Sequence, residues 1–95
     1  MGRVQDKVIV VTGAANGLGQ AIALRLAHDG AKMVLADIDG PGLATTATAI
    51  RDDGGKAVTV VGDVTEEKPA AELIEAAIEH FGQIDGLVNN VGGSR

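Results

Sequence analysis

The sequence contains no cysteine, no tyrosine and no tryptophan, and it has only one phenylalanine. Without cysteine the chain has no disulfide framework, no thiolate nucleophile and no cysteine-ligated metal. Without tyrosine it offers no phenol to a catalytic mechanism, and it lacks the aromatic residues on which nucleic-acid bases stack. No apolar run approaches the ~20 residues of a membrane span. We therefore expect a cytoplasmic protein.

Positive charge is also scarce, because eight lysine and arginine residues stand against thirteen aspartate and glutamate residues, a formal net charge of −5. The basic residues are scattered, so the chain repels phosphate backbones and anionic lipid. We expect neither nucleic acid nor a membrane as a partner. His28 and His80 have no partner at metal-ligand spacing, and we predict no metal site.

Apolar residues are abundant enough for one domain. Leucine, isoleucine, valine and phenylalanine fill 26 of the 95 positions, above the ~20% below which chains tend to stay disordered. The length suits one domain and excludes two, since single domains usually have ~100–150 residues. Residues 1–95 therefore form one unit.

Short runs rich in β-branched residues alternate with stretches of helical periodicity. The runs predict four strands, at Lys7–Thr12, Lys32–Asp37, Ala57–Val61 and Gly86–Asn90. The stretches between them predict three helices, at Leu18–Asp29, 41–53 and 66–81, the last capped by Thr65. Apolar residues share one face of the first helix, at Leu18, Ile22 and Leu26. They share one face of the third at Leu73, Ile74, Ala77, Ile78 and Phe81.

The short connections decide how these elements pair. Four strands separated by three helices, with only a few residues between them, require parallel pairing through right-handed crossovers. Strands this apolar need helices on both faces of the sheet. The predicted fold class is α/β, a βαβαβαβ portion of a doubly wound parallel sheet with strand order 3-2-1-4.

The most informative segment is Thr12-Gly-Ala-Ala-Asn-Gly-Leu-Gly19, between the first predicted strand and the first helix. Its glycines stand where the backbone must turn, approach a ligand closely and let the helix pack on the sheet. The free amide N–H groups and the positive dipole end at the helix start suit a pyrophosphate. Taken alone, the glycines are equally consistent with a tight strand-to-helix turn.

Asp37 closes the second predicted strand, 18 residues beyond Gly19. This is near the offset of ~20 residues at which an acid accepts hydrogen bonds from an adenosine ribose. A carboxylate there repels a 2′-phosphate, and no Arg or Lys in the glycine loop or just after Asp37 neutralises one. We therefore predict NAD(H) rather than NADP(H) as the cofactor. The alternative is a solvated acid at a strand end.

The spacing Gly-x-x-x-Gly-x-Gly after a threonine resembles the glycine motif of the short-chain dehydrogenase/reductase (SDR) family. Asp63-Val64 resembles the pair with which this family recognises adenine, and Asn89-Asn90-Val91-Gly92 resembles its Asn-Asn-Ala-Gly motif. Asp37 matches the acid of its NAD-using members. The resemblance covers the whole chain in the right order, and it implies a Rossmann fold.

The resemblance also implies a role for each matching position. Five loop residues surround the pyrophosphate, Asp37 binds the adenosine ribose, and two further pairs line the adenine end and the inner part of the cleft. The loop residues are Gly13, Asn16, Gly17, Leu18 and Gly19, and the pairs are Asp63 with the Val64 backbone and Asn90 with Gly92. Val91 departs from the family's usual alanine.

Some of these residues have a structural alternative. Asp63 can cap the third helix or form an Asx turn before it. Asn89 and Asn90 can tie the fourth strand to neighbouring backbone, an interpretation that we favour for Asn89. Five glutamates of the third helix predict a solvated face, at Glu66, Glu67, Glu72, Glu75 and Glu79.

Members of the family transfer hydride between a nicotinamide and an alcohol or carbonyl, using a Ser, a Tyr and a Lys placed after the Asn-Asn-Ala-Gly motif. This chain stops three residues past that point, and Ser94 lies too close to the motif to be the family serine. We therefore assign no catalytic residue. The resemblance predicts the NAD(H)-binding half of an oxidoreductase whose catalytic C-terminal half is absent from this chain.

Two other functions are weighed against this one. The first is a free-standing nucleotide-binding fragment without catalysis. The second is a phospho-accepting signalling domain, which would need acids at the ends of the first and third strands, whereas the first ends in Thr12-Gly13. An alcohol or ketone substrate belongs only to a complete enzyme. The fourth strand has no further neighbour in this chain, so we expect a homo-oligomer or association with the missing C-terminal half.

Overall fold

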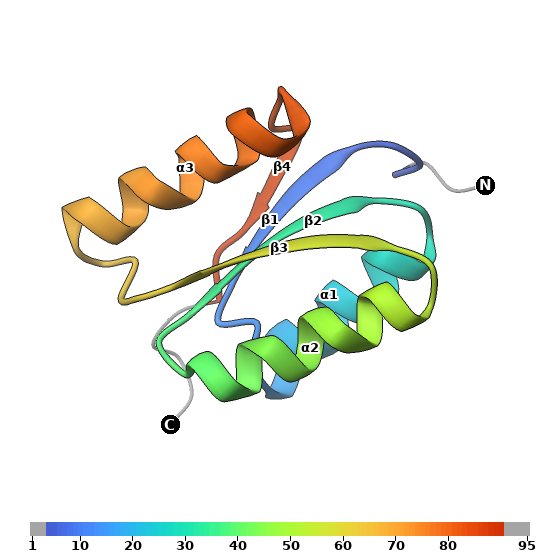
Figure 1. The fold of residues 1–95 in the computed structure, drawn as a ribbon, viewed down its shortest axis with the longest axis horizontal. Helices are drawn as coiled ribbons and strands as arrows, with labels where there is room; N and C mark the ends of the chain where they lie inside the picture. Colours follow the sequence, from blue (N-terminus) through green and yellow to red (C-terminus); the bar gives the residue numbers. More distant parts are fainter. Residues whose placement is uncertain (1–3, 91–95) are drawn as a thin grey trace.

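The computed structural model describes residues 4–90, in which four strands alternate with three helices (Figure 1). The strands are β1 (Val8–Thr12), β2 (Lys32–Asp37), β3 (Lys56–Val61) and β4 (Gly86–Val88). The helices are α1 (Gly17–His28), α2 (Gly40–Asp52) and α3 (Glu67–Phe81).

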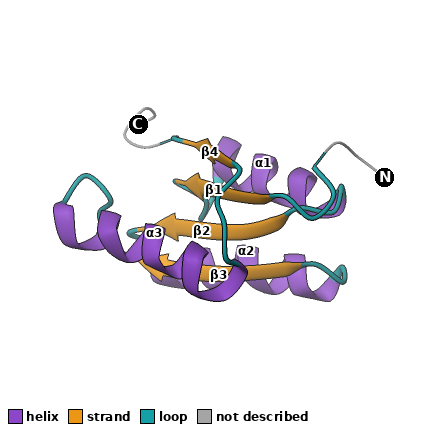
Figure 2. Ribbon diagram, turned by 90° about the horizontal axis from the view of Figure 1, so that it is seen from above, coloured by secondary structure: helices purple, strands orange, loops and turns teal. Residues whose placement is uncertain are grey.

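The strands form one parallel sheet in the order β3-β2-β1-β4. After each strand, a helix carries the chain back to the edge of the sheet where that strand began. The next strand therefore runs in the same direction, and the pairing is parallel. Figure 2 shows α3 on one face of the sheet and α1 and α2 on the other. The predicted α/β class, strand order and two-sided covering are confirmed.

The sheet separates two apolar cores. Alternate side chains of β1 point to opposite faces, so Ile9 and Val11 pack with α1 and α2 while Val8 and Val10 pack with α3. All five residues of β1 are buried, because this strand has a neighbour on each side and helices on both faces. The prediction of buried apolar strands is confirmed most fully here.

The buried face of α1 differs from the apolar face expected from the sequence. Gly19, Ala23 and Ala27 are buried, one position beyond each of the leucines and the isoleucine that set the expected period, and Leu18 is 67% exposed. Small residues on the buried side let the helix approach the sheet closely. The spacing of the large apolar residues alone did not reveal that the close approach of α1 to the sheet requires small side chains.

The apolar face of α3 is also only partly buried. Leu73 and Ala77 are buried, but Ile74 is 48% and Ile78 51% exposed. The helix packs over β3, β2 and β1 rather than over β4 (Figure 2), so one flank of it is left uncovered. The apolar face predicted from the sequence therefore coincides only in part with the buried face.

Two predicted ends were also wrong. The N-cap of α3 is Glu66, and Thr65 belongs to the turn before it. Strand β4 ends at Val88, so Asn89 and Asn90 follow the strand instead of lying within it. Both asparagines bind residues of the first strand and the loop after it, which draws the chain out of the ladder.

Asp85 fixes the start of β4 against β1. The Val8 N–H donates to the Asp85 carboxylate over 2.8 Å, and the Asp85 N–H donates to the Val8 carbonyl, also over 2.8 Å. The Val8 N–H, followed by the Gln83 amide, holds the pKa of Asp85 below its ordinary value. This reciprocal pair sets the register in which β4 joins the sheet.

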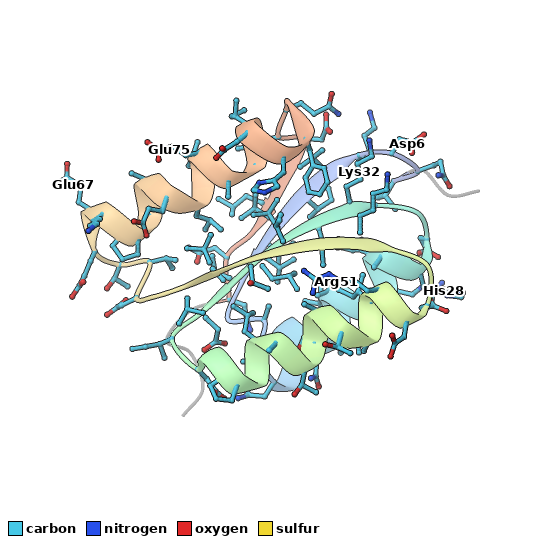
Figure 3. The ribbon with its side chains drawn as sticks, viewed as in Figure 1. Asp6, His28, Lys32, Arg51, Glu67 and Glu75 are labelled. Carbon is cyan, nitrogen blue, oxygen red and sulfur yellow. The ribbon has the colours of Figure 1, made fainter. Side chains whose placement is uncertain are left out.

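Charged side chains lie on the outside of the fold. Glu67 and Glu75 point away from the sheet (Figure 3), and all five glutamates predicted to form a solvated face are exposed. Arg51 is held in place, since its guanidinium donates to the Ala57 carbonyl over 2.7 Å.

Within residues 4–90, no helix combines the length and the apolar character needed to cross a membrane.

Candidate functional site

The predicted site residues gather at one edge of the sheet. Asp37 is the last residue of β2, and the glycine loop, Asp63 and Asn90 follow the ends of β1, β3 and β4. Parallel strands bring these carboxyl ends together. The chain leaves β1 toward β2 on one side, and β4 lies on the other side. Ligands of open α/β sheets bind in the crevice at such a reversal of strand order.

Two glycines let the loop pass close to other backbone. Gly13 has a φ of +67°, and a Cβ there would collide with the Asn90 carbonyl. A Cβ on Gly19 would collide with the Gly13 carbonyl. Both positions are therefore glycine because the loop, the start of α1 and the segment after β4 are packed backbone against backbone.

The third glycine faces open space. Gly17 has a φ of +59°, and among residues 4–90 no atom beyond the adjoining backbone lies within 4 Å of the position that a Cβ would occupy. It is the first residue of α1, whose N-cap Asn16 makes no side-chain capping hydrogen bond and whose first turn holds no acidic residue. The start of α1 thus presents N–H groups and a positive dipole end that no acidic residue of its own first turn neutralises.

Asp37 lies directly beside the glycine loop. Its Oδ2 accepts a hydrogen bond from the Ala15 N–H over 2.9 Å, and its Oδ1 accepts one from the Asp39 N–H over 2.9 Å. The side chain therefore joins the end of β2 to the loop. The role of Asp37 toward a ribose stays a prediction.

Asp63 forms the turn after β3. Its Oδ1 accepts hydrogen bonds from the hydroxyl and the N–H of Thr65, and these two bonds hold the pKa of Asp63 below its ordinary value. This is the Asx turn that the sequence offered as an alternative role. Val64 follows it and packs partly against the core beneath α3.

Asn89 and Asn90 join the end of β4 to β1. The Thr12 hydroxyl donates to the Asn89 side-chain oxygen over 3.0 Å, and the Asn90 N–H donates to the Thr12 hydroxyl over 2.9 Å. The Asn90 amide also reaches the Gly13 carbonyl at 3.4 Å. Asn89 therefore has the structural contact that we favoured, and Asn90 lies against the glycine loop.

The structure brings nine of the ten predicted site residues to this edge, and Gly92 lies outside the described residues. It also adds Gln20 and Thr46, whose side chains donate hydrogen bonds to backbone carbonyls of the glycine loop and are bonded to each other. Sequence reasoning missed both, because neither residue belongs to a motif and the two are distant in the chain.

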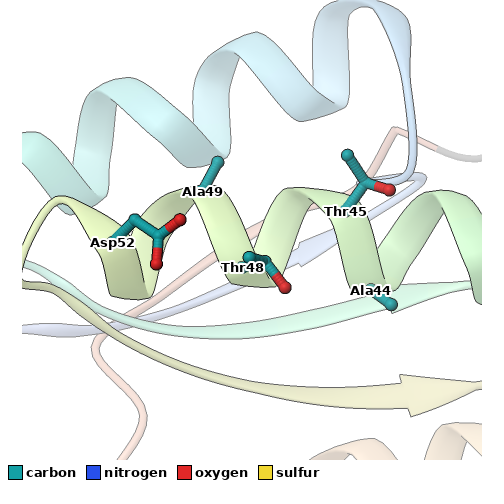
Figure 4. A pocket seen from close by; sticks show the side chains of 5 residues that line it. All are labelled: Ala44, Thr45, Thr48, Ala49 and Asp52. Carbon is teal, nitrogen blue, oxygen red and sulfur yellow. The ribbon is translucent and has the colours of Figure 1, made fainter.

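A shallow depression elsewhere on the surface has no link to these residues. It follows the outer side of α2 and is lined by Ala44, Thr45, Thr48, Ala49 and Asp52 (Figure 4). None of these was predicted as a site residue, and they lie on a helix face turned away from the sheet. We assign it no function.

Comparison with known proteins agrees with the fold and the motifs. The family model described as short chain dehydrogenase matches residues 7–95. The chain belongs to the short-chain dehydrogenase family. The resemblance drawn from the glycine loop, Asp63-Val64 and the asparagine motif is therefore confirmed.

Individual SDR relatives show how much of the family fold is present. A CLA biosynthesis dehydrogenase/reductase of Lactiplantibacillus plantarum is 46% identical over 88 residues, which are 93% of this chain and 31% of that protein. The crystal structure of a hydroxysteroid dehydrogenase from Escherichia coli superposes with a TM-score of 0.91 at 36% identity, covering 96% of this chain and 39% of the other.

An SDR from Burkholderia phymatum, solved in complex with NAD, superposes with a TM-score of 0.87 at 39% identity. This match covers 92% of the present chain and 31% of the Burkholderia chain. The chain thus spans well under half the length of each of these relatives.

Proposed function

We propose that this chain is the NAD(H)-binding portion of a short-chain dehydrogenase/reductase. The observation that carries the proposal is the uncapped start of α1 at Gly17, placed beside the Asp37 carboxylate. An anion site next to a hydrogen-bond acceptor suits a pyrophosphate joined to a ribose. The NAD complex of the Burkholderia relative supports this choice.

The described residues fit such a nucleotide. The N–H groups at the start of α1, with Asn16 and Leu18 beside them, would hold the pyrophosphate, and the open space over Gly17 would let it approach the backbone. Asp37 already accepts two N–H groups, yet an ionised carboxylate offers about four acceptor positions. It therefore keeps capacity for ribose hydroxyls.

The remaining predicted residues extend the site in two directions. We place Asp63 and the Val64 backbone at the adenine end, and Asn90 with Gly92 at the inner end of the cleft. When bound, the nicotinamide would accept a hydride from an alcohol substrate or donate one to a carbonyl substrate. The described residues bind and orient the dinucleotide, and they supply no acid or base for that transfer.

Calorimetric titration of the 95-residue chain with NAD⁺ and NADH tests this function. We expect saturable one-to-one binding. Gly54→Ala serves as a control that should bind as the parent does, because Gly54 lies at the far end of α2 and its φ of +88° makes the change cost stability only. A folded chain that binds neither nucleotide would contradict the proposal.

We further propose that the uncovered surface beside β4 is covered by another polypeptide, namely the C-terminal half of an SDR or, in its absence, a second copy of this chain. Leu87 pairs with Val10 and so lies on the α3 side of the sheet, where it is 61% exposed. The right-handed crossover turns Ile74 and Ile78 toward the same side. The result is one apolar surface next to an open strand edge.

This surface predicts self-association of the 95-residue chain. Sedimentation velocity should show a sedimentation coefficient that rises with concentration in the micromolar range. Leu87→Gln should shift the chain toward monomer, whereas Leu18→Gln, at a similarly exposed leucine on α1, should leave association unchanged. A well-folded monomer at every concentration would contradict the association and favour a free-standing binding module. The cytoplasmic location stays a prediction.

A further inference from the structure

Thr46 is a buried hydroxyl that reaches the glycine loop from α2. The residue is completely buried, and its Oγ1 donates to the Ala14 carbonyl over 2.9 Å. The carbonyl one turn earlier in its own helix, Gly42, lies farther away at 3.3 Å. The shorter contact therefore connects the helix to the loop rather than to itself.

Gln20 completes this contact from α1. Its side-chain Nε2 donates to the Thr46 oxygen over 3.0 Å and lies 3.4 Å from the Ala15 carbonyl. A hydroxyl suits the position between a carbonyl and an amide NH₂ because it both donates and accepts. A valine of the same shape could do neither.

On their other side, Ala14 and Ala15 of the glycine loop are bonded to β2. The Ala14 N–H donates to the Ala36 carbonyl over 3.1 Å, and the Ala15 N–H donates to Asp37 Oδ2 over 2.9 Å. Both polar groups of Ala14 are thus bonded, one to β2 and one to α2. These bonds fix the part of the loop that immediately precedes the open start of α1.

We propose that Thr46 is a positioning residue for the nucleotide site, which rests on the proposed NAD(H) function. Its hydroxyl holds the Ala14 carbonyl inward, so the following N–H groups at the start of α1 face the ligand. Without the hydroxyl, the buried Ala14 carbonyl and Gln20 amide lose a partner. The loop then relaxes to let them reach water, and binding must reverse that relaxation.

Thr46→Val, Thr46→Ser and Thr45→Val test the proposal on the 95-residue chain. Thr45 is the matched control, since it is the exposed neighbour that lines the depression in Figure 4, and its hydroxyl donates to Pro41 within its own helix. We expect Thr46→Val to weaken NAD(H) binding by about tenfold, a loss within the range expected when buried polar groups lose a partner. Thr46→Ser should stay within about twofold of the parent, because the hydroxyl is kept. Thr45→Val should not change the affinity.

Amide hydrogen exchange without nucleotide gives an independent measurement. The Ala15 N–H should exchange about tenfold faster in Thr46→Val and at the parent rate in Thr46→Ser, since its bond to Asp37 depends on the same loop conformation. If Thr46→Val does not fold, Gln20→Met removes the donor to Thr46 and should change both measurements in the same direction.

A lower melting temperature with unchanged affinity and unchanged Ala15 exchange would overturn the proposal, because it would show a merely structural role. If the parent chain binds no NAD(H), the proposed function fails by itself. The exchange of the Ala15 N–H then still decides whether Thr46 positions the loop.

Discussion

Gly13→Ala should destabilise the fold strongly and abolish nucleotide binding, whereas Gly17→Ala should cost less stability and mainly impair binding. Both residues have a positive φ, which costs an alanine about 1–2 kcal/mol. Only at Gly13 would the new Cβ also collide with backbone, at the Asn90 carbonyl. Relieving such an overlap adds about 1–3 kcal/mol, so we expect a total loss of roughly 2–5 kcal/mol in the free energy of unfolding.

Gly54→Ala separates the backbone cost from the effect on the ligand. Gly54 has a φ of +88° and open space around its Cβ position, as Gly17 does, but it follows the far end of α2. Urea unfolding should therefore give similar losses for Gly17→Ala and Gly54→Ala, and a larger loss for Gly13→Ala. Calorimetry should show about tenfold weaker NAD(H) binding only for Gly17→Ala of this pair, because its methyl group occupies space that the pyrophosphate needs. Equal affinities in the two variants would mean that the loop is not the pyrophosphate site.

The sheet could be predicted from the sequence because connection length and residue type decide its topology. Four short β-branched runs with a helix between each pair permit few arrangements other than the parallel order seen here. The helix faces were less predictable. Helix α1 lies so close to the sheet that its small residues Ala23 and Ala27 are buried in place of larger ones. Helix α3 has one flank that the sheet does not cover, and Ile78 on that flank is exposed.

The site was predictable where a motif carries it and unpredictable where single residues support it. The glycines and Asp37 have a spacing that follows from the strand-to-helix geometry. The contact of Asp37 with the Ala15 N–H is not visible in that spacing, because it depends on how far the loop folds over the end of β2. Thr46 is a common residue 26 positions from Gln20, and only packing of α1 on α2 brings them together.

The choice between nucleotides offers the second large effect. Replacing Asp37 by Ser and Ile38 by Arg should reverse the expected preference of the chain for NAD(H) over NADP(H). A carboxylate that accepts from a ribose hydroxyl lies where a 2′-phosphate would stand, and like charges so close cost several kcal/mol. The double variant removes the negative charge and places a guanidinium beside the phosphate, a pairing that Arg makes well.

The ratio of the two affinities is the quantity to measure, because Asp37 also holds the Ala15 N–H. Losing that bond loosens the loop and lowers the affinity for both nucleotides, and this common loss cancels in the ratio. We expect the ratio to change by about 100-fold or more, which corresponds to roughly 2.7 kcal/mol. Asp37→Ser alone should remove the discrimination without reversing it.

Asp39→Ser is the matched control for charge near the site. Asp39 lies two residues beyond Asp37 and caps α2 by accepting from the Gly42 N–H over 3.1 Å, a contact that serine also makes. Its carboxylate bonds the start of α2 rather than the nucleotide. The same change of charge there should therefore leave the ratio of the NAD(H) and NADP(H) affinities within about twofold of the parent. An equal shift in the control would attribute the discrimination to overall charge rather than to Asp37. Tighter binding of NADP(H) by the unaltered chain would contradict the assignment, because the Asp37 carboxylate would then not lie at the ribose.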